Sequence, residues 1–152
     1  MIQRIQTFYL AVALVLMGVI GWLPLAEIAV GDKIYSVTIQ GITEMQSDSI
    51  VMHAWHLLGM LAIIILLEIF VIFGYKKRIR QMRVATYNLI VMIGFVLVSW
   101  LFIRAASNSL GDGIYSLKIP LAFPLVAAIL NFLAIRAIGR DEALVRSIDR
   151  IR

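Results

Sequence analysis

The stretch GDKIYSVTI at residues 31–39 returns almost unchanged as GDGIYSLKI at residues 111–119. Glycine tolerates a positive φ and an aspartate side chain bonds its own backbone, so each Gly-Asp pair predicts a turn. The residues that follow are β-branched or aromatic and alternate with polar ones, which predicts a strand. The two segments could remain separate extended tails. Because an unpaired strand exposes its backbone groups, we expect them instead to pair antiparallel as a small β-ribbon.

Four long runs without a charged residue surround these segments, at residues 5–26, 49–67, 84–103 and 119–135. The chain is 62% hydrophobic and 15% charged, which is far more apolar than a soluble domain. A helix needs roughly 20 apolar residues to cross a hydrocarbon core of about 30 Å. A soluble helical core would show a polar face on each helix, and these runs show none. We therefore predict four transmembrane helices near residues 5–26, 50–75, 84–106 and 120–138.

Basic residues set the predicted orientation. If both termini share one side, that side holds the Lys/Arg run at residues 76–83 and the Arg-rich end from residue 136, whereas the other side holds only Lys33, Arg104 and Lys118. Short loops rich in Lys and Arg stay in the cytoplasm, so we expect both termini to be cytoplasmic. The net charge of +5 then reflects topology and contact with the anionic headgroups of the lipid bilayer, not nucleic-acid binding.

The repeated turn segments belong to a longer internal repeat. RIQTFYL at residues 4–10 resembles RVATYNL at residues 83–89, which gives two halves, 1–80 and 81–139, within a single membrane domain of residues 1–152. Each half is expected to be a helical hairpin, and the two hairpins form a parallel repeat. The predicted fold class is an all-α membrane protein with four transmembrane helices, a small extracytoplasmic β-ribbon and an amphipathic cytoplasmic helix at residues 140–152.

Polar residues inside the spans are candidate site residues, because placing them in lipid costs free energy. Four of them are expected at a similar depth: Glu68, Asn88, Asn131 and Arg136. We expect Glu68 to pair with Arg136 and the asparagines to bridge them. The cluster could be a structural link between helices or a carboxylate that responds to protons or cations. Alternatively, Arg136 snorkels to the surface and Glu68 reaches the basic loop.

The end of the chain carries a second candidate surface. Apolar residues recur there at helical spacing beside a basic residue, which predicts an amphipathic helix that lies on headgroups or docks onto a partner. The predicted cytoplasmic contact surface consists of Arg140, Leu144, Ile148 and Ile151. The i, i+3 spacing of His53 and His56 could offer two ligands to a metal, but no recognised metal-ligand pattern surrounds them. The chain has no cysteine and shows no catalytic constellation or cofactor fingerprint. We therefore expect no catalytic site, cofactor or metal, and no enzyme.

The two ends, MIQRIQTFYL at residues 1–10 and LAIRAIGRDEALVRSIDRIR at residues 133–152, resemble those of the Bacteroidota family called domain of unknown function 4293. The resemblance covers essentially the whole chain. It implies a small multi-pass protein of the bacterial inner membrane with four helices, and it implies no activity, ligand or catalytic residue.

Two functions follow as hypotheses. The first is a non-enzymatic accessory or assembly subunit of a larger inner-membrane complex, which contacts other membrane proteins through its cytoplasmic ends and its outer ribbon. The alternative is a small transporter or channel that uses Glu68 as a coupling carboxylate. A transporter needs a hydrated route past Glu68, whereas a subunit needs a dry, packed interior and an exposed apolar flank.

Overall fold

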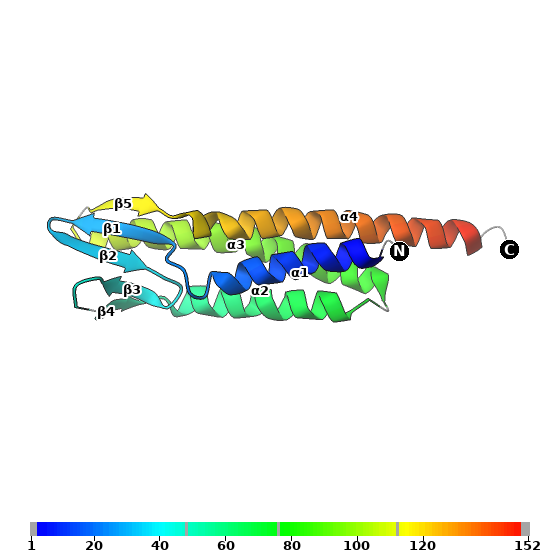
Figure 1. Cartoon of the computed structure of the whole chain (residues 1–152), viewed down its shortest axis with the longest axis horizontal. Coiled ribbons are helices and arrows are strands. Elements are labelled where there is room, and N and C mark those ends of the chain that lie inside the picture. Colours follow the sequence, from blue (N-terminus) through cyan, green and yellow to red (C-terminus); the bar gives the residue numbers. More distant parts are fainter. Residues whose placement is uncertain (1–2, 48, 76, 112, 150–152) are drawn as a thin grey trace.

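A computed structural model describes residues 3–47, 49–75, 77–111 and 113–149 of the chain. It is an elongated molecule in which helices lie side by side and a sheet lies at one end (Figure 1). The helices are α1 (Gln3–Val19), α2 (Trp55–Phe73), α3 (Arg78–Ser109), a short 3₁₀ helix η1 (Ile119–Ala122) and α4 (Phe123–Asp149). Helix α1 packs against α4 and α2, and α3 packs against α4 and α2. Helix α1 begins, and α4 ends, away from the sheet.

The sheet contradicts the predicted all-α class. Five antiparallel strands in the order β4-β3-β2-β1-β5 form it, and this is a substantial layer rather than a small ribbon. The strands are β1 (Ala26–Val30), β2 (Lys33–Val37), β3 (Gly41–Glu44), β4 (Ile50–His53) and β5 (Ile114–Leu117). Strand β4 comes from residues that the hydropathy pattern placed at the start of the second span, because short apolar runs fit both helix and strand. Strand β1 begins at Ala26, the last residue of the predicted first span.

The predicted pairing of the two repeated segments with each other is also wrong. Strands β2 and β5 lie on opposite sides of β1, each antiparallel to it. The register is the same on both sides: Ile28 lies opposite Tyr35 in β2 and opposite Tyr115 in β5. The repeated motif therefore provides two equivalent partners for one central strand, which satisfies the backbone groups on both edges of β1.

The two halves diverge just before their turns. Helix α1 ends at Val19 and leads into β1, whereas α3 continues to Ser109. The first half has Pro24 five residues after α1 ends, whereas α3 contains no proline. Proline in a helix interior removes a hydrogen bond and clashes with the preceding turn, so a regular helix is disfavoured through Pro24, while nothing of this kind interrupts α3. The extra turns of α3 support the sheet, because Ile103 and Ala106 share a core with Ile28.

Three helical segments of the described chain are long and apolar enough to cross a membrane: Trp55–Phe73, Arg78–Ser109 and Ile119–Leu144. This indicates a membrane protein. Helix α1, with 17 residues, is shorter than the predicted first span because the chain leaves the helix after Val19 to form β1. The amphipathic tail is not a separate helix, since α4 runs through Gly139 to Asp149 without a break; residues 150–152 lie outside the described part.

Candidate functional site

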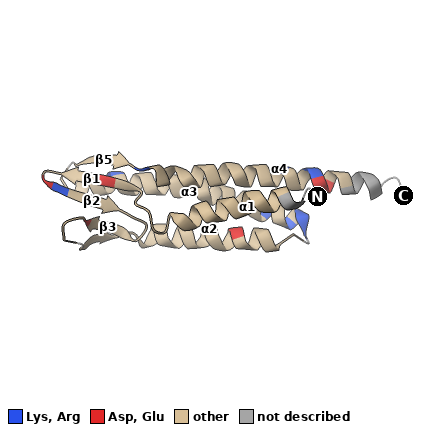
Figure 2. Cartoon of the chain, in the orientation of Figure 1, with Lys and Arg blue, Asp and Glu red and all other residues tan. Residues whose placement is uncertain are grey.

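The site residues Glu68, Asn88 and Asn131 lie on the buried stripes of α2, α3 and α4. Each has an apolar or small buried residue about one helical turn away on both sides, which places the polar side chain on the inward face. These neighbours are Ile64 and Val71 on α2, Ala85 and Met92 on α3, and Ala127 and Ala134 on α4. Figure 2 shows how isolated the acidic position of α2 is within the uncharged helical middle.

One oxygen of Glu68 connects the three helices. The Asn88 Nδ2 group donates a hydrogen bond to Glu68 Oε2 at 2.5 Å, and Asn131 Nδ2 donates to the same oxygen at 2.7 Å. The relative exposure of all three residues is 0%. A buried donor or acceptor that loses its hydrogen-bond partner is costly. The site therefore holds α2, α3 and α4 in one register.

Three other oxygens in this polar layer have no hydrogen-bond partner within the described residues: Glu68 Oε1, Asn88 Oδ1 and Asn131 Oδ1. Buried polar atoms are normally satisfied, so each of these acceptors has capacity for a donor. A proton on the carboxyl group or an ordered water can supply one. Chemically, the layer can accept hydrogen bonds, but the described residues contain no cluster of three His, Asp or Glu side chains that could hold a metal ion.

Apolar clusters enclose the polar layer on both sides. One contains Met17, Ile64 and Met92 and extends into the sheet; the other contains Leu10, Val71 and Ala85. The polar layer thus lies between two groups of buried apolar side chains.

Arg136 does not join Glu68. At 100° per residue, five residues turn Arg136 about 140° away from Asn131 on the same helix. Its side chain is exposed and lies on a groove of about 430 Å³ between α1 and α4. Arg140 and Leu144 line the same groove, while the side chains of Ile148 and Ile151 lie outside the described part of the chain.

Hydrogen bonds at the same end join α1 to α4, α3 to α4 and α3 to α2, and the sequence pattern alone did not identify them. Gln6 Nε2 donates to Asp141 Oδ2 at 2.5 Å, and Arg78 Nη1 donates to the backbone oxygen of Asp141 at 3.4 Å. Gln81 Nε2 donates to the backbone oxygen of Val71 at 2.9 Å. The sequence offered one signal for them, the presence of polar residues in the turns near helix ends, where backbone groups need partners.

The sheet carries its own charges. Lys33 Nζ lies 2.8 Å from Glu44 Oε1, and Lys118 Nζ lies 2.8 Å from Glu27 Oε2. The hydrogen bond from Lys33 and a second one from Ser47 lower the pKa of Glu44, and the bond to Glu44 raises the pKa of Lys33. The two histidines serve aromatic packing: His53 stacks on Trp55 with ring centroids 5.6 Å apart, and His56 meets the edge of Phe102 at 5.0 Å.

Comparison with protein families gives a match over residues 2–151 to the model described as Domain of unknown function (DUF4293). A comparison with curated proteins finds none that matches the chain.

Proposed function

Since the chain belongs to the DUF4293 family, whose description carries no activity, we propose from the structure itself that the protein is a non-enzymatic accessory or assembly subunit of a larger inner-membrane complex. The observation that carries this proposal is the edge strand β4. It is apolar, exposed along its whole length and flanked by a cavity. The subunit would bind an extended segment of another membrane protein along this edge.

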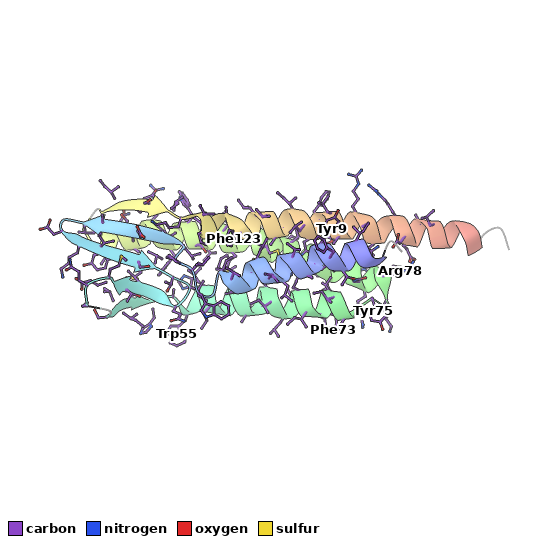
Figure 3. The ribbon with its side chains drawn as sticks, viewed as in Figure 1. Tyr9, Trp55, Phe73, Tyr75, Arg78 and Phe123 are labelled. Carbon is purple, nitrogen blue, oxygen red and sulfur yellow. The ribbon has the colours of Figure 1, made fainter. Side chains whose placement is uncertain are left out.

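The proposed placement is multi-pass in the bacterial inner membrane, with both termini in the cytoplasm and the sheet outside. The Lys/Arg run around the α2–α3 connection lies at the end away from the sheet (Figure 2), which fits the positive-inside rule. Aromatic residues mark both ends of α2: Trp55 lies toward the sheet, and Phe73 and Tyr75 lie at the opposite end (Figure 3). Tryptophan and tyrosine favour the interfacial depth of a bilayer.

Strand β4 offers a free edge for pairing. Residues Ile50, Val51 and Met52 are all exposed, and the strand contains neither a charge nor a proline. Edge strands of natural proteins usually carry a charged side chain or a proline, because an edge without them can pair with a strand of another chain. The opposite edge, β5, is also exposed and also contains neither a charge nor a proline, but Lys118 follows it directly and pairs with Glu27. A charged residue thus adjoins the last residue of β5, whereas a cavity adjoins β4.

The cavity beside β4 adds a specificity element. It has a volume of about 270 Å³ and is lined by Gln40, Ile50, His53, Trp55 and Leu58. When an extended segment adds to a sheet edge, backbone hydrogen bonds provide affinity and side-chain pockets provide specificity. A pocket of this lining suits an apolar or aromatic side chain of the added strand.

The packed interior also favours a subunit over the alternative. Glu68 is buried between two apolar clusters, whereas a transporter would need a hydrated route to it. The unpartnered Glu68 Oε1 is the observation that favours a transporter or channel with Glu68 as the coupling carboxylate.

Purification in mild detergent at native expression tests the proposal. We expect a co-purifying membrane protein whose yield falls at least about tenfold for Val51→Lys, because a charge on the edge strand blocks pairing. Leu117→Lys on β5 is the matched control, since Val51 and Leu117 are both 48% exposed. Recovery of free protein from the unmodified chain, or equal losses for the two variants, would contradict the proposal.

A further inference from the structure

The groove between α1 and α4 lies far from the sheet and has no place in the proposed function. Its walls are apolar: Ile5 and Tyr9 come from α1, and Leu133 and Ala137 come from α4. Figure 3 shows Tyr9 at the seam where α1 meets α4. With a volume of about 430 Å³, the groove has room for a headgroup and the first part of an acyl chain.

Depth places this groove at a membrane surface. Asn88 lies about 18 Å along α3 from Trp100, which belongs to the aromatic residues on the sheet side. Asn131 is at the level of Asn88, because both bind Glu68 Oε2. Arg136 then lies about 26 Å and Arg140 about 32 Å from that aromatic level, so a hydrocarbon core of about 30 Å ends between them.

Charge selects the kind of ligand. Arg136 and Arg140 are one helical turn apart on α4, both are exposed, and neither guanidinium forms an ion pair with a described residue. Asp141 also lines the groove, but its Oδ2 accepts the Gln6 amide at 2.5 Å. Two arginines against one engaged carboxylate leave a net positive groove. Guanidinium groups bind phosphate oxygens in bidentate fashion, and basic pockets between transmembrane helices bind anionic headgroups.

We propose that this groove is a binding site for one anionic phospholipid. The headgroup phosphate lies between Arg136 and Arg140, and an acyl chain follows Leu133, Ile5 and Tyr9 toward the hydrocarbon core. The lipid fills the seam between α1 and α4 at the end where Gln6 already joins them. This site is independent of strand β4, so either proposal can fail without the other.

Native mass spectrometry of the full chain in mild detergent, with added phosphatidylglycerol or phosphatidylcholine, tests the proposal. We expect one retained phosphatidylglycerol and at least about tenfold less phosphatidylcholine. The double variant Arg136→Gln/Arg140→Gln should lower phosphatidylglycerol retention about tenfold, to the phosphatidylcholine level. The matched control, Lys77→Gln/Arg83→Gln, removes two exposed basic residues outside the groove and should retain the lipid.

A steric variant separates the groove from its charge. Ala137→Trp keeps both arginines but places a large side chain in the groove, so it should also lose the lipid. This variant also serves if the double arginine variant fails to fold. Millimolar glycerophosphate, which lacks acyl chains, should leave the lipid bound. Equal retention of the two lipids by the unmodified chain, equal losses in both double variants, retention by Ala137→Trp, or displacement by glycerophosphate would each overturn the proposal.

Discussion

Tyr35 and Tyr115 lie opposite the same residue of the central strand, one on each side of Ile28. They occupy the same position in the two copies of the IYS motif. In an antiparallel sheet, directly opposed residues are close neighbours and their side chains share one face. The internal repeat is therefore used to build two flanks for a strand that occurs only in the first half of the chain.

Gly113→Ala should weaken the attachment of β5. A Cβ atom at Gly113 would lie 2.5 Å from Val30 Cγ2 and 2.8 Å from the backbone oxygen of Ala29, which is too close. Overpacking of this kind costs about 1–3 kcal/mol, so we expect a lower thermal midpoint in detergent and faster hydrogen exchange in β5. Gly59→Ala in α2 is the control, since a Cβ there has nothing within 4 Å. Equal stability of the two variants would contradict this packing.

Replacing Glu68 tests the polar layer. Glu68→Gln keeps an acceptor for the amides of Asn88 and Asn131, whereas Glu68→Leu leaves both donors buried without a partner. Each unsatisfied donor costs about 1–3 kcal/mol, so only the leucine variant should be strongly destabilised in denaturant titrations.

The same pair of variants also bears on the alternative function. If Glu68→Gln folds normally and keeps its co-purifying partner, the carboxylate is structural. A lost cellular phenotype in a well-folded Glu68→Gln protein would instead favour the transporter or channel.

The ion pair between Lys33 and Glu44 on the sheet should be lost in acid. The pKa of Glu44 is lowered chiefly by the hydrogen bond from Lys33, so the stabilisation is complete above the unfolded-state pKa and disappears as pH falls through the folded-state value. Carboxyl ¹³C NMR should show the Glu44 midpoint moving to higher pH in Lys33→Met. Ser47→Ala should move it in the same direction, because Ser47 Oγ also donates to Glu44, at 3.0 Å. An unchanged midpoint in Lys33→Met would show that the pair does not persist in solution.

Single introduced cysteines can test the proposed orientation without background labelling, because the chain has no cysteine of its own. Met45→Cys, on the β3–β4 connection, should react with an impermeant maleimide in intact spheroplasts. Lys77→Cys, between α2 and α3, should react only after the membrane is opened. Labelling of both positions from the same side would contradict the proposed topology.

The amino-acid sequence by itself was enough to predict helices that are long and apolar enough to cross a membrane, and to predict the Gly-Asp turns. The length of an uncharged run and the chemistry of a Gly-Asp turn act within a few residues, so α2, α3, α4 and the strands after both turns follow from them. A local signal also limits α1, since Pro24 disfavours a regular helix through that position and α3 contains no proline. These features need no knowledge of distant parts of the chain.

Only the tertiary structure decided which elements meet. AEIAV at residues 26–30 fits a helix end as well as a strand, and it becomes β1 because β2 and β5 satisfy its two edges. The rotation of α4 about its axis turns Asn131 toward Glu68 and Arg136 toward the groove. Strand pairing and helix rotation are non-local: they depend on contacts between residues that lie tens of positions apart, and their free energy appears only when the whole chain packs.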